Sequence, residues 1–467
     1  MTVTEKPSTA ATFDLVSPSS GQVIAQVPDQ TVQDARNAVE RSVKAYASWR
    51  QTSVYERSVL LRRFNDLMLR DVDEIARLIA SEMGKPITEA AGEVKYAASF
   101  LEWYAEEAKR VYGTVVPSQN VHKQLIVTHE PVGPVYAVTP WNFPAAMATR
   151  KIGPALAAGC TIILKAAEQS PLTALKMAEL WTEAGGPADT FIVLTTSDPV
   201  PTTKVMMDDA RIRKITFTGS TEVGRLLAQQ AAPTLKRVSL ELGGHAPYLI
   251  FDDADLDQAV ADVLACKFRN AGQTCVCVNR VYVQRGVAEE FTRKLSEAAA
   301  RLKVGDPLDA STQIGPLVDQ QGLDKVKRHV EDALSKGATA VTGGEATGGL
   351  YFAPTVLSQI TPDMLIMQEE TFGPVAPVIA FDTEEEAVAA ANNTEFGLAA
   401  YLWTTNLARA FRVSAALEYG IIGLNDPIPS TAQAPFGGVK QSGYGREGGL
   451  WGIQEYLSVK YLSINVK

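Results

Sequence analysis

The stretch KITFTGSTEVGRLLAQQAAPTLKRVSLELGG, residues 214–244, decides the fold class of this chain of 467 residues. It contains two short apolar strands, 214–218 and 237–240, separated by residues with the spacing of an amphipathic helix. Three further strands with helical stretches between them precede it, at 135–139, 161–165 and 191–195. Short apolar strands that alternate with helices are typical of a parallel sheet covered by helices on both faces. The sequence therefore predicts a doubly wound α/β domain.

Polar residues and glycines gather where these strands end. In parallel sheets of this kind, ligands bind beyond the carboxyl ends of the strands. We therefore expect a ligand site along this edge of the sheet. Its candidate residues are Trp141, Asn142, Lys165, Gly219, Ser220 and Glu241.

The rest of the chain divides into regions with different patterns. Apolar residues at three- to four-residue spacing predict helices from 31 to about 111, with Gly84 and Pro86 between two of them. The stretch 115–128 is rich in β-branched residues and reads as an extended excursion that could cross to another subunit. After Gly244 strands and helices alternate again to about Leu424, which predicts a second α/β domain. We expect the glycine-rich segment 436–449 to be a long functional loop and the opening twenty residues to contain a loose tail.

Composition and charge argue against several classes of protein. A hydrophobic content of 46% and a charged content of 21% are those of an ordinary globular chain, without the long apolar runs of a membrane protein. The net charge of −9 argues against affinity for nucleic acid or anionic lipid. Four cysteines are too few to crosslink such a chain, and no apolar leader opens it, so we expect reduced thiols and a cytoplasmic location. The four histidines form no HExxH pair and Cys275 and Cys277 lack a second ligand pair, so we expect no metal site.

Three features of the sequence carry chemistry only in combination. Cys275 lies between a predicted helix, 255–270, and a predicted strand, 278–283, where a thiol can face a cleft; a lone cysteine is more often an inert small hydrophobe. Glu241 can project into the same cleft as a general base, or can be a surface glutamate before a turn. Gly219 and Gly224 flank Ser220 in a strand-to-helix turn whose free N–H groups could face a phosphate, although this is not the GxGxxG pattern and can be a simple tight turn.

Seven segments resemble the motifs of the aldehyde dehydrogenase superfamily in order and approximate spacing, over nearly the whole chain. The resemblance implies a Rossmann-like NAD(P)-binding domain (1–112 and 132–243), an α/β catalytic domain (244–445) and a small β extension for oligomerisation (113–131 and 455–467). It also implies a homodimer or homotetramer. The segments are VTPWNFP, KAAEQSP, FTGSTEVG, SLELGG, GQTC, EETFGP and PFGGVKQSG.

The resemblance also implies the roles of individual residues. Cys275 resembles the nucleophile that forms a thioester, Asn142 the side-chain donor of the oxyanion hole, and Glu241 the base that activates water. The residues similar to cofactor contacts of the family lie in four of the motifs. They are Trp141, Lys165 and Glu168 near the adenosine ribose and nicotinamide, Gly219, Ser220 and Gly224 near the pyrophosphate, and Glu370 with Phe372 as the clamp on the nicotinamide ribose.

Within the superfamily the chain most resembles succinate-semialdehyde dehydrogenases, through AMATRKIGPALAAGC, KFRNAGQTCVC and a serine before PFGG. This resemblance implies that Arg150, Arg269 and Ser430 hold a substrate carboxylate, for which the planar guanidinium is suited. Alternatively, the two arginines pair with structural acids. Pro427 and Pro429 depart from the family near Ser430, so another semialdehyde, such as glutarate semialdehyde, or an aliphatic or aromatic aldehyde remains open.

The cofactor and the second cysteine of the motif also follow from the resemblance. Glu168 can accept both hydroxyls of the adenosine ribose but repels a 2′-phosphate, which favours NAD over NADP; Lys165 beside it leaves NADP use open. Cys277 matches a CVC pair that can close into a strained, easily reduced disulfide, or is a packed small residue.

Two other functions stay open. One is a non-catalytic protein that kept the fold. The other is an acylating dehydrogenase that transfers the thioester to coenzyme A, against which Glu241 argues.

Overall fold

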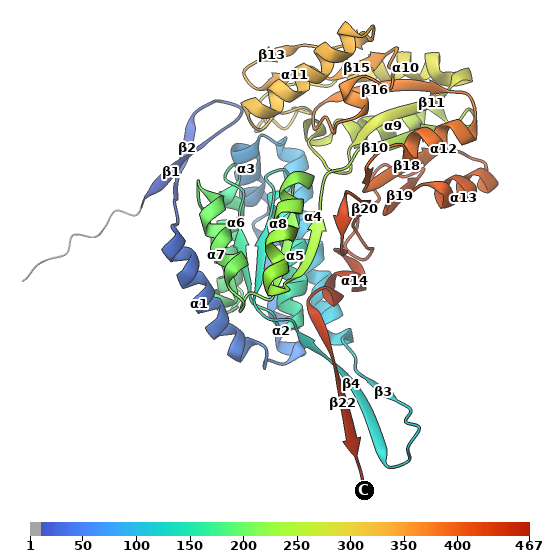
Figure 1. The fold of residues 1–467 in the computed structure, drawn as a ribbon. Helices are drawn as coiled ribbons and strands as arrows, with labels where there is room; N and C mark the ends of the chain where they lie inside the picture. Colours follow the sequence, from blue (N-terminus) through green and yellow to red (C-terminus); the bar gives the residue numbers. More distant parts are fainter. Residues whose placement is uncertain (1–10) are drawn as a thin grey trace, which may run out of the picture.

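The computed structural model describes residues 11–467 and shows two α/β lobes with a three-stranded sheet extending from them (Figure 1). The first lobe is built on a six-stranded sheet in which five strands are parallel, as predicted. All four residues of Ile162–Lys165 are buried, which is the pattern of a strand covered on both faces. In spatial order the strands are β21 (Gly443–Tyr444, antiparallel), β9 (Arg237–Glu241), β8 (Lys214–Thr218), β5 (Val135–Val138), β6 (Ile162–Lys165) and β7 (Phe191–Leu194).

Helices cover both faces of this sheet. Alternate residues of each strand face opposite sides, so apolar residues on both sides form a core with the helices. Val135 and Ala137 pack in one apolar core with α2 to α6, and Tyr136 packs in another with α1, α7 and α8. The helices are α1 (Val32–Trp49), α2 (Val54–Arg70), α3 (Val72–Met83), α4 (Ile87–Glu107), α5 (Pro144–Ala158), α6 (Pro171–Glu183), α7 (Pro199–Asp208) and α8 (Thr221–Ala231).

The second lobe contains a seven-stranded sheet that is parallel except for one edge strand. In spatial order its strands are β12 (Thr339–Thr342, antiparallel), β15 (Thr355–Ser358), β16 (Val375–Phe381), β11 (Val278–Gln284), β10 (Ala246–Ile250), β18 (Ala399–Trp403) and β19 (Ile421–Leu424). The helices of this lobe are α9 (Leu256–Lys267), α10 (Arg285–Ala299), α11 (Gln320–Ser335), α12 (Glu384–Asn392) and α13 (Leu407–Ala416), and a small hairpin joins β13 (Ala346–Gly348) to β14 (Tyr351–Phe352).

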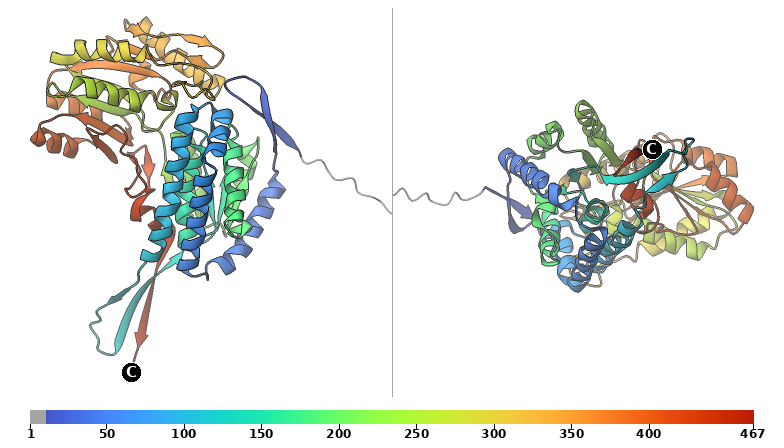
Figure 2. Two further views of the ribbon diagram at one scale, coloured as in Figure 1. Left: turned by 180° about the vertical axis from the view of Figure 1, so that it is seen from behind. Right: turned by 90° about the horizontal axis from the view of Figure 1, so that it is seen from below.

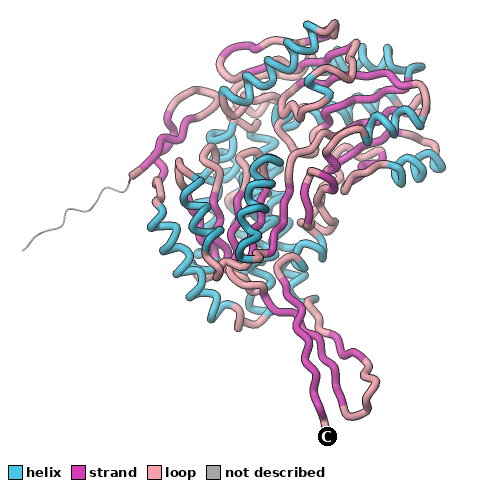
Figure 3. The backbone as a smooth tube through the Cα atoms, in the orientation of Figure 1, coloured by secondary structure: helices cyan, strands magenta, loops and turns pink. Residues whose placement is uncertain are grey.

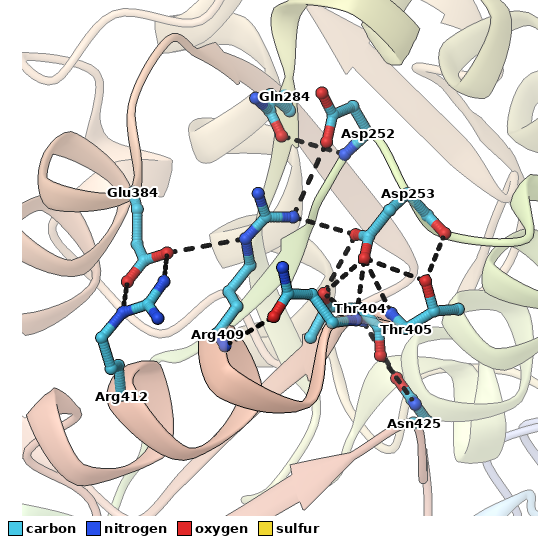
Figure 4. Close-up of polar contacts among 10 residues, drawn as sticks. Asp252, Asp253, Gln284, Glu384, Thr404, Thr405, Arg409, Arg412 and Asn425 are labelled. Atoms are coloured by element: carbon cyan, nitrogen blue, oxygen red, sulfur yellow. Dashed lines mark hydrogen bonds and ion pairs between the residues drawn. The ribbon is translucent and has the colours of Figure 1, made fainter.

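A polar cluster closes the carboxyl edge of this second sheet (Figure 4). Asp253, just after β10, accepts hydrogen bonds from the Thr404 hydroxyl and from the main-chain N–H groups of Thr405 and Asn406 at the start of α13. Arg409 on α13 lies 3.0 Å from the Asp253 carboxylate and 3.5 Å from that of Glu384. The chain's own side chains therefore occupy this edge of the sheet where β10 and β18 end.

The predicted extended excursion belongs to a narrow antiparallel sheet that extends away from both lobes (Figures 1 and 2). We call this sheet the stalk, and its strands, with the C-terminus at their far end, also stand apart in the tube view (Figure 3). The stalk consists of β3 (Thr114–Val116), β4 (Lys123–Pro131) and β22 (Leu457–Asn465).

The glycine-rich segment 436–449 connects the two lobes. Its first short strand, β20 (Val439–Lys440), pairs with β17 (Phe396–Gly397) of the second lobe, whereas β21 pairs with β9 of the first. The chain then forms α14 (Gly449–Gln454) and enters the stalk. The segment therefore passes between the two lobes where the carboxyl end of β9 presents Glu241.

The prediction of a loose opening segment was wrong for its second half. Residues Thr12–Val16 form β1, which pairs with β2 (Val23–Pro28), because the buried side chains of Leu15 and Val27 anchor this hairpin. Residues 1–10 lie outside the described part of the chain. Among the helices described, none has the length and apolar character needed to span a membrane.

Candidate active site

Two cavities meet at Cys275. A cavity of about 340 Å³, which we call the cofactor cavity, is lined by Cys275 together with Trp141, Asn142, Gly219, Ser220, Glu370 and Phe372. A cavity of about 310 Å³, which we call the substrate cavity, is lined by Cys275 together with Lys85, Tyr96, Phe143, Arg150, Arg269, Ser430 and Phe436. The thiol therefore lies where two separate ligands can approach it from different sides.

A tight turn presents Cys275 between α9 and β11. Asn270 and Ala271 have left-handed φ angles of 52° and 53°, and Gly272 follows with a φ of 75°. A Cβ on Gly272 would overlap the carbonyl oxygen of Gly373, so only glycine fits here. Non-glycine residues in this conformation store strain and are common at functional sites. Among the described residues, the Cys275 N–H has no hydrogen-bond acceptor and can therefore face an oxyanion.

The thiol of Cys275 is protonated in this environment. Burial raises its pKa to about 12; Arg150 and Arg269 oppose this shift, and Glu370 and Glu241 add to it. A thiolate at neutral pH therefore needs an additional positive charge close to the sulfur.

Asn142 follows β5 and lies against the cysteine turn. Its side chain is buried, and Nδ2 donates one hydrogen to the main-chain carbonyl of Gln273 at 3.0 Å. A primary amide carries two hydrogens, so the second remains for a ligand oxygen in the cavity. The structure thus brings the predicted oxyanion donor to the predicted nucleophile.

Glu241, the last residue of β9, is 3% exposed, so the alternative of a surface glutamate is wrong. Burial and then the neighbouring Glu447 raise its pKa well above the ordinary carboxyl value, while Lys151 and Arg150 partly oppose the shift. The glycine-rich segment approaches closely, since a Cβ on Gly437 would lie 2.7 Å from Glu241 Oε1. A raised pKa makes the ionised carboxylate a stronger base, which suits it to accept a proton from water.

The cofactor cavity has aromatic and acidic walls. Trp141 and Phe372 pack edge to face, with ring centroids 5.6 Å apart, and Phe372 has a left-handed φ of 55°. Glu370 accepts a hydrogen bond from the Gly244 N–H at 3.2 Å, and burial raises its pKa to about 7. Such groups fit the apolar ring and the hydroxyls of a nucleotide.

The turn before α8 differs from the prediction in one respect. The N–H of Gly219 donates to the Glu241 carbonyl and that of Gly224 to the Ser220 carbonyl, so neither is free for a phosphate. A Cβ on Gly224 would overlap the Leu242 side chain, which makes this glycine a packing residue. Ser220 is the N-cap of α8, and the helix's first N–H groups, at 221 and 222, have no acceptor within the helix. These groups fit an anion.

Lys165 and Glu168 lie one strand away, after β6, and line neither cavity. The Lys165 ammonium is buried and bonded to the half-exposed Glu168 carboxylate, and burial lowers the pKa of Lys165. Because β6, β5 and β8 are neighbours, Glu168, Trp141 and Ser220 follow one another along the carboxyl edge of the sheet. This row of a carboxylate, an aromatic side chain and a helix N-terminus fits the parts of an extended dinucleotide.

The two predicted arginines enter the substrate cavity in different environments. Arg150 is fully buried over the Phe436 ring at 3.9 Å, donates to the Tyr96 hydroxyl, and lies 3.8 Å from Glu447. Arg269 is half-buried, and among the described residues no carboxylate lies within 4 Å of it. Its Nε is buried without an acceptor. The alternative that the arginines serve structural acids stays open, since Arg150 lies near Glu447, and Arg269 opposes the raised pKa of Glu89, which lines the same cavity.

Cys277 faces neither cavity. Its buried thiol lies 3.4 Å from the Lys267 ammonium, and all four cysteines are free thiols in this structure. Residues 11–467 contain no cluster of three side chains suited to hold a metal ion. The reversible disulfide with Cys275 stays a prediction.

Sequence reasoning missed part of the substrate cavity. Lys85, Tyr96 and Glu93 come from α4 and the turn before it. Lys85 lies between Gly84 and Pro86, two residues that mark a helix boundary in the sequence. A lysine inside a Gly-Lys-Pro turn indicates a site residue only when the structure shows that its side chain is buried.

Comparison with known proteins agrees with this geometry. The profile of the aldehyde dehydrogenase family matches residues 5–462. The chain is 50% identical to succinate-semialdehyde dehydrogenase [NADP(+)] of Escherichia coli, over 97% of this chain and 94% of that protein, and 50% identical to glutarate-semialdehyde dehydrogenase of Pseudomonas putida, over 97% and 95%. A crystal structure of an NADP-dependent enzyme of E. coli superposes with a TM-score of 0.96 at 50% identity, covering 97% of this chain and 95% of that chain. The chain belongs to the aldehyde dehydrogenase family.

Proposed function

We propose that this chain oxidises an aldehyde with a distal carboxylate, first of all succinate semialdehyde, to the dicarboxylate. The observation that carries the proposal is Arg269, which faces the same cavity as Cys275 and has no carboxylate partner within 4 Å among the described residues. Arg150 from α5 faces this cavity too, so two guanidinium groups can hold one carboxylate. The relatives named for succinate and glutarate semialdehyde support the same class of substrate.

The residues around the thiol support a covalent mechanism. The Cys275 sulfur adds to the aldehyde carbon, and the tetrahedral oxyanion accepts hydrogen bonds from the Asn142 amide and the Cys275 N–H. Collapse of this oxyanion to a thioester expels a hydride from the same carbon, for which bound NAD(P)⁺ would supply the acceptor as well as a positive charge that favours the thiolate. Glu241 then takes a proton from water, whose oxygen attacks the thioester carbon and releases the acid and the Cys275 thiolate.

NAD rather than NADP is the cofactor in this proposal. The half-exposed Glu168 carboxylate can accept both ribose hydroxyls, and its charge repels a 2′-phosphate. Lys165 beside it partly neutralises that charge, and one relative is named for NADP(+). The ratio of kcat/KM with NAD to kcat/KM with NADP tests this, and a large preference for NADP would refute the role given to Glu168.

Glutarate semialdehyde is the second candidate substrate. Ile428, between Pro427 and Pro429, lines the substrate cavity with Ser430, so this loop sets the length of the cavity. Kinetics with succinate semialdehyde, glutarate semialdehyde, butanal and benzaldehyde test the substrate class, with and without coenzyme A. Equal kcat/KM for butanal and succinate semialdehyde would refute it, and turnover that requires coenzyme A would indicate acyl transfer.

We also propose a homodimer or homotetramer joined through the stalk, and a cytoplasmic location based on the free thiols. Val459 and Tyr461 on β22 are 69% and 59% exposed, although both are large and apolar. An exposed apolar strand is a ready surface for pairing with another chain. A monomer in light scattering at micromolar concentration would refute the oligomer.

A further inference from the structure

A buried ion pair lies directly behind Asn142. The Lys85 ammonium donates to the Glu93 carboxylate on α4 and, at 2.8 Å, to the main-chain carbonyl of Asn142. Both charged side chains are 1% exposed. The ammonium also lies 3.6 Å from the centroid of the Phe143 ring. A carboxylate, a carbonyl and an aromatic face thus surround the three donors of Lys85.

The same ion pair also fixes the start of α5. This helix has no capping bond from its own N-cap side chain. Instead, Glu93 Oε1 accepts hydrogen bonds from the N–H groups of Ala145 at 3.0 Å and Ala146 at 3.3 Å. The carboxylate is therefore held both by Lys85 and by the helix dipole, and the loop carrying Asn142 is tied to α4 on two sides.

The second lobe locks the turn that carries Lys85. Gly84 has a φ of 83°, and a Cβ there would lie 2.6 Å from Pro316 Cγ. The main-chain N–H of Ile87, just after the turn, donates to the Pro307 carbonyl at 2.8 Å. The backbone of Lys85 is thus held where the two lobes touch, which leaves its side chain little freedom.

Stability alone is a weak reason for this arrangement. Burying two charges costs solvation, and an apolar side chain of similar volume often stabilises a core equally well. What an ion pair adds is a directed bond, since Lys85 donates to the main-chain carbonyl of Asn142, whose side chain lines the cofactor cavity with Cys275. We propose that Lys85, held by Glu93, is a positioning residue that orients the Asn142 amide toward the oxyanion. This inference rests on the oxyanion role proposed above for Asn142.

A Lys85→Met variant removes the donor but keeps the length of the side chain. Losing an oxyanion donor costs about 10²–10³ in rate, and losing its orientation costs part of that, so we expect kcat to fall roughly tenfold or more. The KM for the aldehyde and the Kd for NAD, measured by calorimetry, should change less than about threefold, because ground-state binding does not use this bond. An unchanged kcat in folded Lys85→Met would overturn the proposal.

A double-mutant cycle separates positioning from general damage. In an Asn142→Ala background, Lys85→Met should lower kcat little further, because the group that it positions is gone. Two full and independent losses would overturn the proposal. An unchanged kcat in Asn142→Ala alone would instead refute the oxyanion role itself, so the two failures are distinguishable.

Lys214 offers a matched control. It is also fully buried, with its ammonium bonded to Ser239 and 3.5 Å from Glu455, but it lines neither cavity. We expect Lys214→Met to lower thermal stability and to keep kcat; a kcat loss equal to that of Lys85→Met would overturn the proposal. If Lys85→Met does not fold, Glu93→Gln replaces it, with a smaller kcat loss expected that disappears in the Asn142→Ala background. Folded Glu93→Gln with full kcat would overturn the proposal.

Discussion

Replacing Arg269 by alanine should separate acidic from neutral aldehydes. Arg269 is the cleaner of the two arginines to remove, because it is half-buried and no carboxylate within 4 Å loses a partner. Arg150 is packed over aromatic rings and lies 3.8 Å from Glu447, so its removal would leave a void and take one of two cations from this buried acid. A loss of activity in Arg269→Ala that is confined to the acidic aldehyde can therefore be assigned to the substrate carboxylate.

The expected loss of kcat/KM in Arg269→Ala follows from the loss of one charge-assisted hydrogen bond, which contributes roughly 1.5–3 kcal/mol. Since about 1.4 kcal/mol corresponds to a factor of ten, kcat/KM for succinate semialdehyde should fall roughly 10- to 150-fold. Butanal has the same chain length and no carboxylate, so its kcat/KM should stay within about threefold. Arg269→Lys keeps the charge but loses the planar fork and should give an intermediate loss.

The measurement is the initial rate of NADH formation with both aldehydes at saturating NAD. The ratio of the two kcat/KM values removes any effect of misfolded enzyme, because that effect lowers both rates equally. Equal losses for butanal and succinate semialdehyde would show that Arg269 supports the site and not the substrate carboxylate. An unchanged kcat/KM for both aldehydes would show that Arg269 does not contribute to substrate binding.

Three further predictions concern other parts of the chain. Glu241→Gln should form the thioester and release one equivalent of NADH in a burst, with steady-state turnover slowed about 10²- to 10⁴-fold. In the wild-type enzyme the pKa of Glu241 is raised, so the rate of deacylation should increase with pH above the ordinary carboxyl range. A wild-type deacylation rate that is independent of pH would contradict this. Asp253→Asn should lower the free energy of unfolding at pH 7 by roughly 1.5–3 kcal/mol. Burial acts to raise the pKa of Asp253, but Thr404, Thr405 and Arg409 hold it below its usual value, so this stability is present above about pH 4 and is lost as pH falls through the folded pKa; an equal deficit in urea unfolding at pH 3 would be inconsistent. Cys277→Ala should make peroxide inactivation irreversible by dithiothreitol, and inactivation that stays reversible in this variant would count against the disulfide.

The sequence was sufficient to predict most strands and helices of the first lobe, because a strand buried on both faces is a short apolar run that can be recognised locally. The five parallel strands of the first lobe and its helices were predicted from short apolar runs and helical spacing. Residues 12–16 were not, because a two-stranded hairpin anchored by Leu15 leaves little periodicity. The close approach of Leu242 to Gly224 was not predicted for a related reason: a glycine that allows a helix to pack closely and one that binds a phosphate look alike in sequence.

By itself the sequence determined which side chains could do chemistry, through motifs that keep nucleophile, acid and amide in a fixed order along the chain. Only the tertiary structure decided which of them meet. Arg150 in α5 and Arg269 after α9 face one cavity with Cys275, and Lys85 reaches the Asn142 peptide from the turn before α4. The physical reason is that local spacing fixes which face of an element is buried, whereas convergence depends on the packing of elements distant in sequence against one another.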